Sequence, residues 1–390
     1  MVVQNYYDVD PRVRREAECL VAEGYAVDVF ALRNKGKDKV YNLNGVNVLT
    51  LLLIKKRTNP GRYIFESMFF FVWSFVLVTW RMLHQRYSVI QVHTVPDFLI
   101  FVGLIPKLLG SKVILDMHEV MPELYRSKYV ISERHWMIGL LKWIESASIH
   151  FANHVIVVTQ PIKDLLETRG FPPEKMSVVL NSADTELFMV CPSSVRNQNK
   201  PFVFMFHGTV SSLYGLDRAI RAFAMASADL NGAEFWIVGD GPERAKLEQL
   251  ARELRLSKQV KFIGIIPHRE IPDWLEQCDV GVIAARQDLY LDLAFFCKLP
   301  EYILSRKPAI APRLHTTQYY FSDNAIAYFT PQDEAELVAR MVDLYRSPEL
   351  RHRLIDQAAY EYAAIDWSVM KLRYLQVIES LLYSQFLLDD

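Results

Sequence analysis

The feature that most constrains the fold is a repeated alternation of short apolar runs with amphipathic segments along the whole chain. Runs such as 89–93 and 112–118 are short and rich in β-branched residues, so each predicts a buried strand. The segments between them carry helix signals. Asp10 and Pro11, ahead of a stretch that ends at Gly24, predict an N-cap and a first helical residue. This alternation is typical of βα units and predicts α/β domains with parallel sheets covered on both faces.

The alternation breaks once, where a polar stretch with two prolines and no periodicity indicates an interdomain linker. It restarts afterwards and gives way to a mostly helical end from Asp333 onward. We therefore predict two tandem doubly wound, Rossmann-like domains that face a cleft. The first strand is expected to be very short, unless a few residues are missing before it. The predicted divisions are a first domain over 1–190, a linker over 191–201, a second domain over 202–365, and a C-terminal helix over 366–390 that packs back on the first domain.

Composition excludes several classes of function. The 390 residues suffice for two or three domains, and 51% apolar with 23% charged residues is a globular composition. A net charge of −1 provides no global field that favours nucleic acid. The four cysteines lie far apart, which argues against a zinc site or a disulfide framework and suits a reducing compartment. Polar residues follow the first five almost at once, so we expect no secretory signal and a cytoplasmic protein.

The most apolar stretch runs from Ser67 to Trp80, and its 14 residues fall short of the roughly 20 needed to span a bilayer. Two interpretations remain open. The stretch could form a helix buried against a sheet, or a helix that lies in a membrane surface. The buried helix is the more ordinary interpretation, and two tryptophans and a set of nearby cations give the second some support. These cations are Lys55, Lys56, Arg57, Arg62 and Arg81.

The stretch 298–311 (KLPEYILSRKPAIA) places Glu301 near the start of a short predicted helix, followed by a buried strand. A carboxylate there is stabilised by the helix dipole and can accept hydrogen bonds from a sugar diol. Capping or plain solvation is the alternative.

Three strand-to-helix loops rich in glycine could hold a ligand. The loop from Gly208 and Thr209 to Gly215 resembles a phosphate cradle, because N–H groups and a helix dipole would point at an anion. The other two loops carry Gly239 with Gly241, and Gly264 with Ile265 and Ile266; the last could face a flat base. Ordinary turns remain the alternative for all three, and Pro242 is predicted as a first helical residue.

His118, in the sequence DMHE at the end of a predicted strand, is a candidate catalytic residue, with a structural role as the alternative. His93 and Asp97 are similarly placed, and for Asp97 we expect a capping role. The chain has no Ser-His-Asp order, no His-rich metal spacing and no nucleotide-binding Lys motif. We therefore predict no metal and no cofactor.

Taken in order, these motifs resemble the retaining glycosyltransferases of the GT-B fold, in the large family 4-like group that includes bacterial capsule and lipid-linked mannosyl- and glucosyltransferases. The resemblance covers nearly the whole chain. Each motif is loose, but the ordered series is fairly specific. The motifs are 10–18 (DPRVRREAE), 92–97 (VHTVPD), 116–123 (DMHEVMPE), 179–188 (VLNSADTELF), 207–210 (HGTV), 238–243 (VGDGPE), 262–264 (FIG) and 298–311.

The resemblance implies a role for each motif. Glu301 would hold the donor ribose, the loop from Gly208 to Gly215 the diphosphate, and the segment from Gly264 to Ile266 the base. Gly239 and Gly241 would complete the nucleotide site, and His118 would lie against the donor sugar. The first loop would bring some of a small set of residues near the acceptor. This set is Tyr6, Tyr7, Asp8 and Arg12.

Three positions depart from the family pattern. Leu293 stands where the family has its first Glu, with only Asp292 beside it. Thr209 and Tyr214 stand where an Arg and a Lys for the diphosphate are usual. Lys298 is our candidate for the missing cation, and Arg218 is a weaker one.

The resulting hypothesis is a retaining, metal-independent hexosyltransferase that uses a UDP- or GDP-sugar as donor. Its acceptor would be a hydroxyl, such as that of a lipid-linked glycan in polysaccharide biosynthesis at the inner face of the membrane. A non-catalytic GT-B scaffold and a sugar-nucleotide epimerase are the alternatives.

Overall fold

The computed structural model describes residues 1–53, 60–189 and 200–389, which form two compact units. Unit 1 joins Met1–Asn181 to the residues from Met370 onward, and unit 2 is Ser182–Val369. The contacts thus divide the chain at Ser182, earlier than expected, while the predicted linker lies almost wholly outside the described residues. Polar contacts help to join the C-terminal segment to the rest of unit 1. The Tyr374 hydroxyl donates to Gln91 Oε1 at 2.6 Å, and Lys371 Nζ lies 2.9 Å from Glu23.

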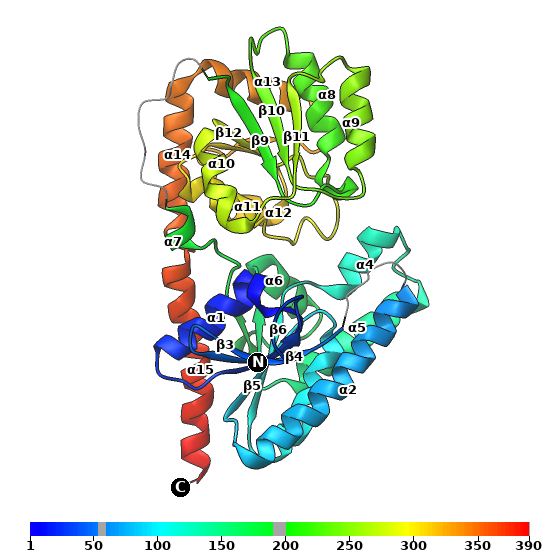
Figure 1. Ribbon diagram of the computed structural model, residues 1–390, viewed down its shortest axis with the longest axis vertical. Helices are drawn as coiled ribbons and strands as arrows, with labels where there is room; N and C mark the ends of the chain where they lie inside the picture. Colours follow the sequence, from blue (N-terminus) through cyan, green and yellow to red (C-terminus); the bar gives the residue numbers. More distant parts are fainter. Residues whose placement is uncertain (54–59, 190–199, 390) are drawn as a thin grey trace. The chain divides into compact units, whose positions relative to one another are not determined.

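Unit 1 contains an eight-stranded sheet in the order β3-β4-β2-β1-β5-β6-β7-β8 (Figure 1). The strands are parallel except for the edge strand β3, which forms an antiparallel hairpin with β4. Sequence reasoning missed this hairpin, although its turn, Asn44-Gly45 with positive φ at both residues, is a typical hairpin signal. The strands are β1 (Val2–Tyr6), β2 (Asp28–Leu32), β3 (Val40–Leu43), β4 (Val46–Leu51), β5 (Val89–His93), β6 (Lys112–Met117), β7 (His154–Val157) and β8 (Met176–Val178).

The helices of unit 1 begin largely where the sequence signals place them. Asp10 is the N-cap of α1 and accepts a hydrogen bond from the Val13 amide, with Pro11 as the first helical residue. Asp97, in contrast, is not the expected cap, because Pro96 is the N-cap of η2 (Asp97–Gly103). The helices are α1 (Pro11–Ala22), α2 (Pro60–His84), α3 (Leu104–Leu108), α4 (Met121–Tyr129), α5 (Trp136–Phe151), α6 (Gln160–Thr168) and α15 (Trp367–Asp389), with the 3₁₀ turns η1 (Tyr7–Val9) and η3 (Pro173–Lys175).

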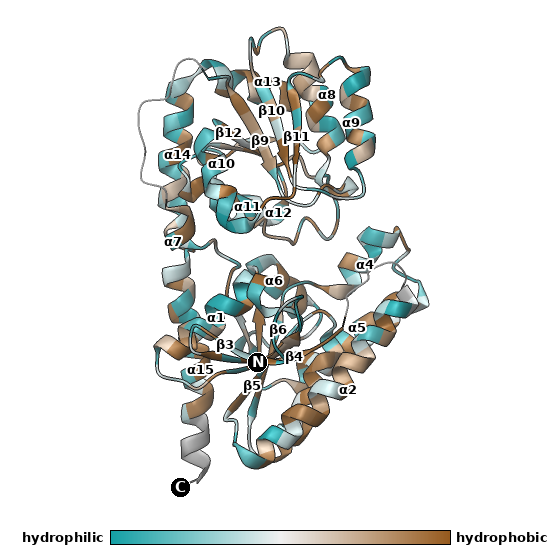
Figure 2. Ribbon diagram, viewed as in Figure 1, coloured by the Kyte–Doolittle hydropathy of each residue, from teal (hydrophilic) through white to brown (hydrophobic). Residues whose placement is uncertain are grey.

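Helix α2 is much longer than the apolar stretch that predicts it. It has 25 residues, and within it Gly61–His84 meets the length and hydropathy of a membrane-crossing helix. Neither predicted alternative describes it fully. One side is buried against unit 1 through residues such as Phe70, Ser74 and Val78, while the opposite side is exposed. Figure 2 shows that this helix is hydrophobic over most of its surface.

Unit 2 contains a six-stranded parallel sheet in the order β11-β10-β9-β12-β13-β14, so the predicted fold class of two doubly wound parallel-sheet domains is confirmed. The chain runs outward from β9 through β10 to β11 and then returns to the other side of β9. The strands are β9 (Val203–His207), β10 (Glu234–Val238), β11 (Val260–Gly264), β12 (Val280–Val282), β13 (Ala309–Pro312) and β14 (Ala327–Phe329).

The helices of unit 2 cover this sheet. Helix α9 begins at Arg244 with Glu243 as N-cap, so Pro242 precedes the helix and is not its first residue as predicted. The helices are α7 (Thr185–Phe188), α8 (Leu216–Ala226), α9 (Arg244–Glu253), α10 (Ile271–Gln277), α11 (Lys298–Leu304), α12 (His315–Tyr320), α13 (Glu334–Arg346) and α14 (Pro348–Tyr362), with the 3₁₀ turns η4 (Ser212–Tyr214) and η5 (His268–Glu270).

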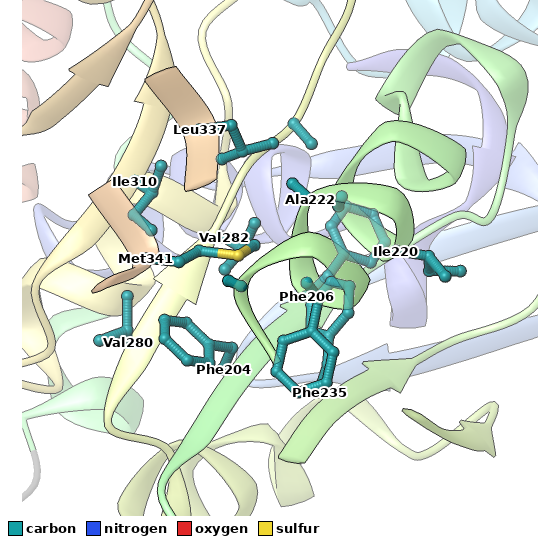
Figure 3. Packing of buried hydrophobic residues seen from close by; sticks show 14 of the residues in the cluster. Phe204, Phe206, Ile220, Ala222, Phe235, Val280, Val282, Ile310, Leu337 and Met341 are labelled. Carbon is teal, nitrogen blue, oxygen red and sulfur yellow. The ribbon is translucent and has the colours of Figure 1, made fainter. Parts of the chain in front are cut away.

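The core of unit 2 depends on alternate residues of its central strand. Phe204 and Phe206 of β9 point to the same face and join Phe235 of the neighbouring strand (Figure 3). Residues of α8 and α13, among them Ile220 and Met341, close this cluster from the helix side. This packing fixes the carboxyl end of β9, where the predicted ligand loop begins.

Candidate functional site

Two of the predicted donor-binding glycines first serve the packing of neighbouring loops. A Cβ at Gly239 would lie 2.0 Å from the carbonyl oxygen of Gly208, and one at Gly241 would lie 2.2 Å from that of Val210. The Gly208 amide donates a 2.9 Å hydrogen bond to the Val238 carbonyl at the end of β10, and the Val210 amide donates one of the same length to the Asp240 carbonyl in the loop that follows. A side chain at either glycine would push these loops apart, so the structure gives a packing reason for both glycines, and their role in donor binding stays a prediction.

The loop after β9 leaves its first residues open. Gly208 and Thr209 are exposed, whereas Gly215 is buried, with φ of 57° and a Cβ position 2.1 Å from the Ala284 carbonyl oxygen. Gly215 is also the N-cap of α8. The first N–H groups of an α-helix have no partner inside the helix, so this end of α8 favours an anion. A phosphate-binding role of this loop stays a prediction, which the exposed Gly208 and Thr209 leave room for.

Lys298, the first residue of α11, lies beside this loop. Its Nζ is 4.0 Å from the centre of the Tyr214 ring and 4.8 Å from that of Phe206, and a Cβ at Gly208 would lie 3.6 Å from it. Burial lowers the pKa of Lys298 to about 8, although Cys297 and Glu301 oppose the shift. Within the part of the chain that the structure describes, no carboxylate forms an ion pair with it. A buried cation held only by aromatic rings is costly, and an anion next to Gly208 would reduce that cost.

The Glu301 carboxylate lies between two imidazoles. His207 Nε2 is 2.5 Å from Oε2, and His268 Nε2 is 3.2 Å from Oε1. Burial alone would raise the pKa of Glu301, but the hydrogen bonds from His207 and His268 outweigh it and hold the pKa at about 2. Glu301 lies in the first turn of α11, as predicted, and the structure adds two imidazoles that hold its charge.

His207 is itself fixed by a chain of hydrogen bonds. The Tyr302 hydroxyl donates to the Met205 carbonyl at 2.9 Å, so it must accept from His207 Nδ1 at 3.1 Å. These contacts orient the His207 ring so that its Nε2 faces the Glu301 carboxylate. A carboxylate can accept about four hydrogen bonds, so Glu301 retains capacity for a diol.

Sequence reasoning missed His207, His268 and Tyr302 as site residues. His207 and Tyr302 are adjacent to residues that were predicted, so the pattern held a signal for them. His268 lies in η5, and no local signal connects it with Glu301, 33 positions away. In the segment before it, Ile265 is 81% exposed, Gly264 has a positive φ of 91° and Ile266 is half-buried; a contact of this segment with the base stays a prediction.

In unit 1, His118 belongs to a buried cluster around Asp116. The nearest Asp116 oxygen lies 2.9 Å from His93 Nδ1 and 3.4 Å from His118 Nε2. Burial opposes ionisation, but Arg12 and the two histidines hold the pKa of Asp116 well below its usual value. Burial, and after it the charge of the neighbouring Asp116, holds the pKa of the Glu16 carboxyl well above its usual value.

Arg12 is a correction to the sequence analysis. It was expected near the acceptor, but it is buried and donates to both oxygens of Asp116 and to the Val179 carbonyl. The ligand atoms of His93, Asp116 and His118 lie within 4.8 Å of one another, as a metal site requires. A divalent cation there would, however, stand beside the Arg12 guanidinium, so these residues fit a hydrogen-bonded cluster better than a metal site.

His118 also lines a cavity of about 190 Å³ at the carboxyl ends of β1 and β5. These are the strands at which the chain order of this sheet reverses, the usual place for a ligand in such sheets. Of the other residues expected near the acceptor, Tyr7 is fully buried, Tyr6 is half-buried, and Asp8 accepts a 3.0 Å hydrogen bond from Asn34. None of these three lines the cavity. Its polar lining is Gln4, Asn5, Asp10, Tyr63, Thr94, His118 and Glu119.

The remaining departures have structural explanations. The carbonyl of Asp292 accepts hydrogen bonds from Thr316, and its carboxyl faces the His315 amide, so it does not replace the missing first Glu near Glu301. Sequence reasoning also missed Arg286, which donates to the Ser212 carbonyl and to Asp217. It braces the loop before α8 and is neutralised there.

The chain matches two families of known proteins. Residues 9–182 match the family described as glycosyl transferase 4-like domain, and residues 192–360 match glycosyl transferases group 1. Among curated relatives, it is 25% identical over 236 residues to the alpha-D-kanosaminyltransferase of Streptomyces kanamyceticus. The match covers 56% of this chain and 58% of that protein. The chain thus matches little more than half the length of this relative.

Solved structures share the fold over nearly the whole chain. Sucrose-phosphate synthase from Thermosynechococcus elongatus has a TM-score of 0.74 at 19% identity and covers 96% of this chain and 93% of its own. HepE from Anabaena, solved in complex with UDP, has a TM-score of 0.70 at 17% identity and covers 97% and 99% respectively. At these identities the likeness concerns the fold alone.

Proposed function

The chain belongs to the GT4-like glycosyltransferases of the GT-B fold, and from this premise we propose that it is an enzyme that transfers a sugar from a nucleoside-diphosphate sugar to a hydroxyl acceptor. Its full activity is a proposal, because the curated relatives are matched over only part of their length.

One observation supports this proposal most strongly. A single short helix, α11, holds a buried cation and a buried carboxylate next to the open loop at Gly208 and Thr209. This arrangement lies at the carboxyl end of β9, where the strand order of unit 2 reverses. A nucleoside diphosphate offers the matching groups, since its phosphates are anionic and its ribose carries a diol. We therefore assign the diphosphate to Lys298 and the start of α8, and the ribose to Glu301.

The chemistry follows from these positions. As the bond between the sugar and the diphosphate breaks, negative charge grows on the leaving oxygens. Lys298 stabilises that charge from a site that is already desolvated, where a fixed cation acts more strongly than in water. Two cations that the resemblance would place at positions 209 and 214 are missing here, and Lys298 of α11 would take the place of one of them. Ile265 would contact the base, and His118 would contact the transferred sugar.

We further propose that transfer retains the anomeric configuration, needs no metal and uses a UDP-sugar. HepE, which shares the fold, was solved with UDP and with UDP-glucose, and this supports UDP as the first donor to test. We place the activity at the cytoplasmic side of the membrane, in glycan synthesis, with the cavity at His118 receiving the acceptor hydroxyl.

The test is a transfer assay with the full chain. The protein is incubated with each sugar nucleotide and a panel of glycan and lipid-linked acceptors, and both the nucleoside diphosphate and the glycoside are quantified. NMR of the new anomeric proton reports the configuration. The proposal predicts glycoside formation that EDTA leaves unchanged and Lys298→Met slows at least about tenfold. Nucleotide binding without turnover would support a scaffold, and interconversion of free sugar nucleotides would support an epimerase; either outcome contradicts the proposal.

A further inference from the structure

The outward side of α2 is a continuous apolar stripe, defined here as Phe65, Phe69, Val72, Val76, Trp80 and Leu83. These residues follow one another at intervals of three or four, so they share one face of the helix. Each is between 48% and 69% exposed. At 1.5 Å per residue the stripe is about 27 Å long. A surface helix normally presents polar residues on this side, and an apolar face of this size marks an interaction surface.

The opposite side of α2 rests on its own unit. Buried positions recur at intervals of four and include polar residues such as Glu66 and Ser74. Phe71 packs edge-on against Phe98 of η2, with ring centres 5.9 Å apart. A helix with a packed, partly polar side cannot face lipid all around, so α2 fits a position along a membrane surface better than one across it.

Helix α5 carries a second, shorter stripe of the same kind. Trp136, Leu140 and Trp143 are 72%, 44% and 67% exposed and follow the same helical spacing. Both helices contact η2, α5 through a hydrogen bond from Ser148 to the Asp97 carbonyl. Exposed tryptophans of this kind favour the boundary between lipid and water, where an apolar ring and a polar N–H are both satisfied.

Charge around α2 indicates which surface covers the stripe. Between positions 54 and 86 the sequence has six Lys or Arg and one acidic residue, Glu66, which is buried, whereas the whole chain has a net charge of −1. In the sequence these cations lie towards the two ends of the stripe; Arg62 pairs with Glu66 at 2.6 Å, and Arg81 lies 3.7 Å from Asp28. This distribution suits an apolar face bordered by anionic headgroups. The six are Lys55, Lys56, Arg57, Arg62, Arg81 and Arg86.

We propose that the α2 stripe docks on a lipid bilayer that contains anionic phospholipid, with the tryptophans of α5 as a second contact. The first turn of the same helix carries Tyr63, which lines the cavity at His118. Docking would therefore hold that cavity near the membrane surface, so the acceptor class is an amphiphile whose hydroxyl head lies at that surface. This part of the inference rests on the proposed transferase function.

The test is flotation of the full chain with two kinds of vesicle. One is phosphatidylcholine alone, and the other is phosphatidylcholine with about one quarter phosphatidylglycerol. The proposal predicts that the protein floats with the anionic vesicles, less with the neutral ones, and less at high salt. The variant Phe65→Ser/Val76→Ser should reduce the bound fraction at least about tenfold, because it removes two apolar side chains that docking on the bilayer would bury.

A matched control substitutes equally exposed apolar residues elsewhere, Met225→Ser/Leu372→Ser, which are 60% and 62% exposed in the wild type. This control should float like the wild type. Equal flotation of the stripe variant and the wild type, or no flotation of the wild type, would overturn the proposal. A wild-type dimer that the stripe variant breaks, without vesicle binding, would also overturn it by assigning the stripe to a second copy.

Nucleotide binding separates this inference from the proposed function. The stripe variant should retain the thermal shift produced by the donor nucleotide, since its substitutions lie in unit 1 and outside the Glu301 site. Vesicle binding without any nucleotide response would support the docking surface and contradict the proposed transferase function. A nucleotide response without vesicle binding would contradict only the docking surface.

Discussion

Replacing Lys298 by Met should make the protein more stable and less active at the same time. The ammonium is buried, and its pKa of about 8 lies below the ordinary lysine value of about 10.5. This difference corresponds to ~3 kcal/mol by which the fold disfavours the charged form. The rings of Tyr214 and Phe206 act in the opposite sense, by about 1–2 kcal/mol in total for a cation in this geometry. Desolvation is therefore the larger effect.

Met has a similar length, carries no charge and packs well against aromatic rings. We expect Lys298→Met to stabilise the ligand-free protein by about 1–2 kcal/mol at pH 7, which for a unit of this size raises Tm by about 3–6 °C. Between pH 8 and 10.5 the unfolded chain holds the lysine proton and the folded chain does not, so wild-type stability rises with pH across this window. The gain from the substitution should shrink over the same range.

The assay is thermal unfolding of wild type, Lys298→Met and Lys298→Arg at pH 7 and pH 9.5, with the transfer rate measured on the same samples. Lys298→Arg keeps a cation and should retain more transfer activity than Lys298→Met. A Met variant that is less stable than wild type at pH 7 would refute the desolvation argument. A Met variant with an unaltered transfer rate would remove Lys298 from the site.

Three further predictions concern Glu301 and the loop glycines. Glu301→Gln should weaken binding of the nucleoside diphosphate by about 1–3 kcal/mol, because neutral amide hydrogen bonds to a diol replace charge-assisted ones. Calorimetry measures this change, and unchanged affinity in a folded variant would contradict the assignment of the ribose to Glu301. Because the pKa of Glu301 is depressed to about 2, its contribution to stability is present above about pH 4.5 and is lost as the pH falls towards 2, so acid titration of wild type against Glu301→Gln should show a steeper loss in the wild type. Gly241→Ala should destabilise by about 1–3 kcal/mol in a denaturant titration, since its Cβ would meet the Val210 carbonyl at 2.2 Å, whereas Gly139→Ala, with open space around it in α5, should be neutral or stabilising.

The sequence predicted much of the fold because the strands are short apolar runs with clear punctuation. Asp10 and Pro11 mark the start of α1, and the run 202–207 marks the central strand of unit 2. The extent of α2 was underestimated because amphipathic turns at both ends extend the helix beyond its apolar centre, from Pro60 to His84. Local sequence pattern does not identify such turns as helical, and the contact of α2 with η2 is visible only in the tertiary structure.

Prediction of the site was more limited. The position of Glu301 and the loop at Gly208 could be found from motif order, and Lys298 from its spacing to Glu301. Glu301 and the two imidazoles that hold it come from three separate elements of the chain, α11, β9 and η5, so only tertiary structure shows that His268 reaches it. Arg12 was misassigned because an arginine after a first loop looks accessible in sequence, whereas Asp116, 104 positions later, draws it into the interior.

The central claim is that unit 2 binds a nucleoside diphosphate through Lys298 and Glu301. Its most direct test is calorimetric titration of the full chain with UDP, GDP, ADP and dTDP, and with the matching nucleosides. The account predicts that one diphosphate binds, that its nucleoside binds more weakly, that Glu301→Gln weakens both, and that Lys298→Met weakens the diphosphate more than the nucleoside. Absence of binding by every diphosphate, or equal binding to wild type and both variants, would contradict it.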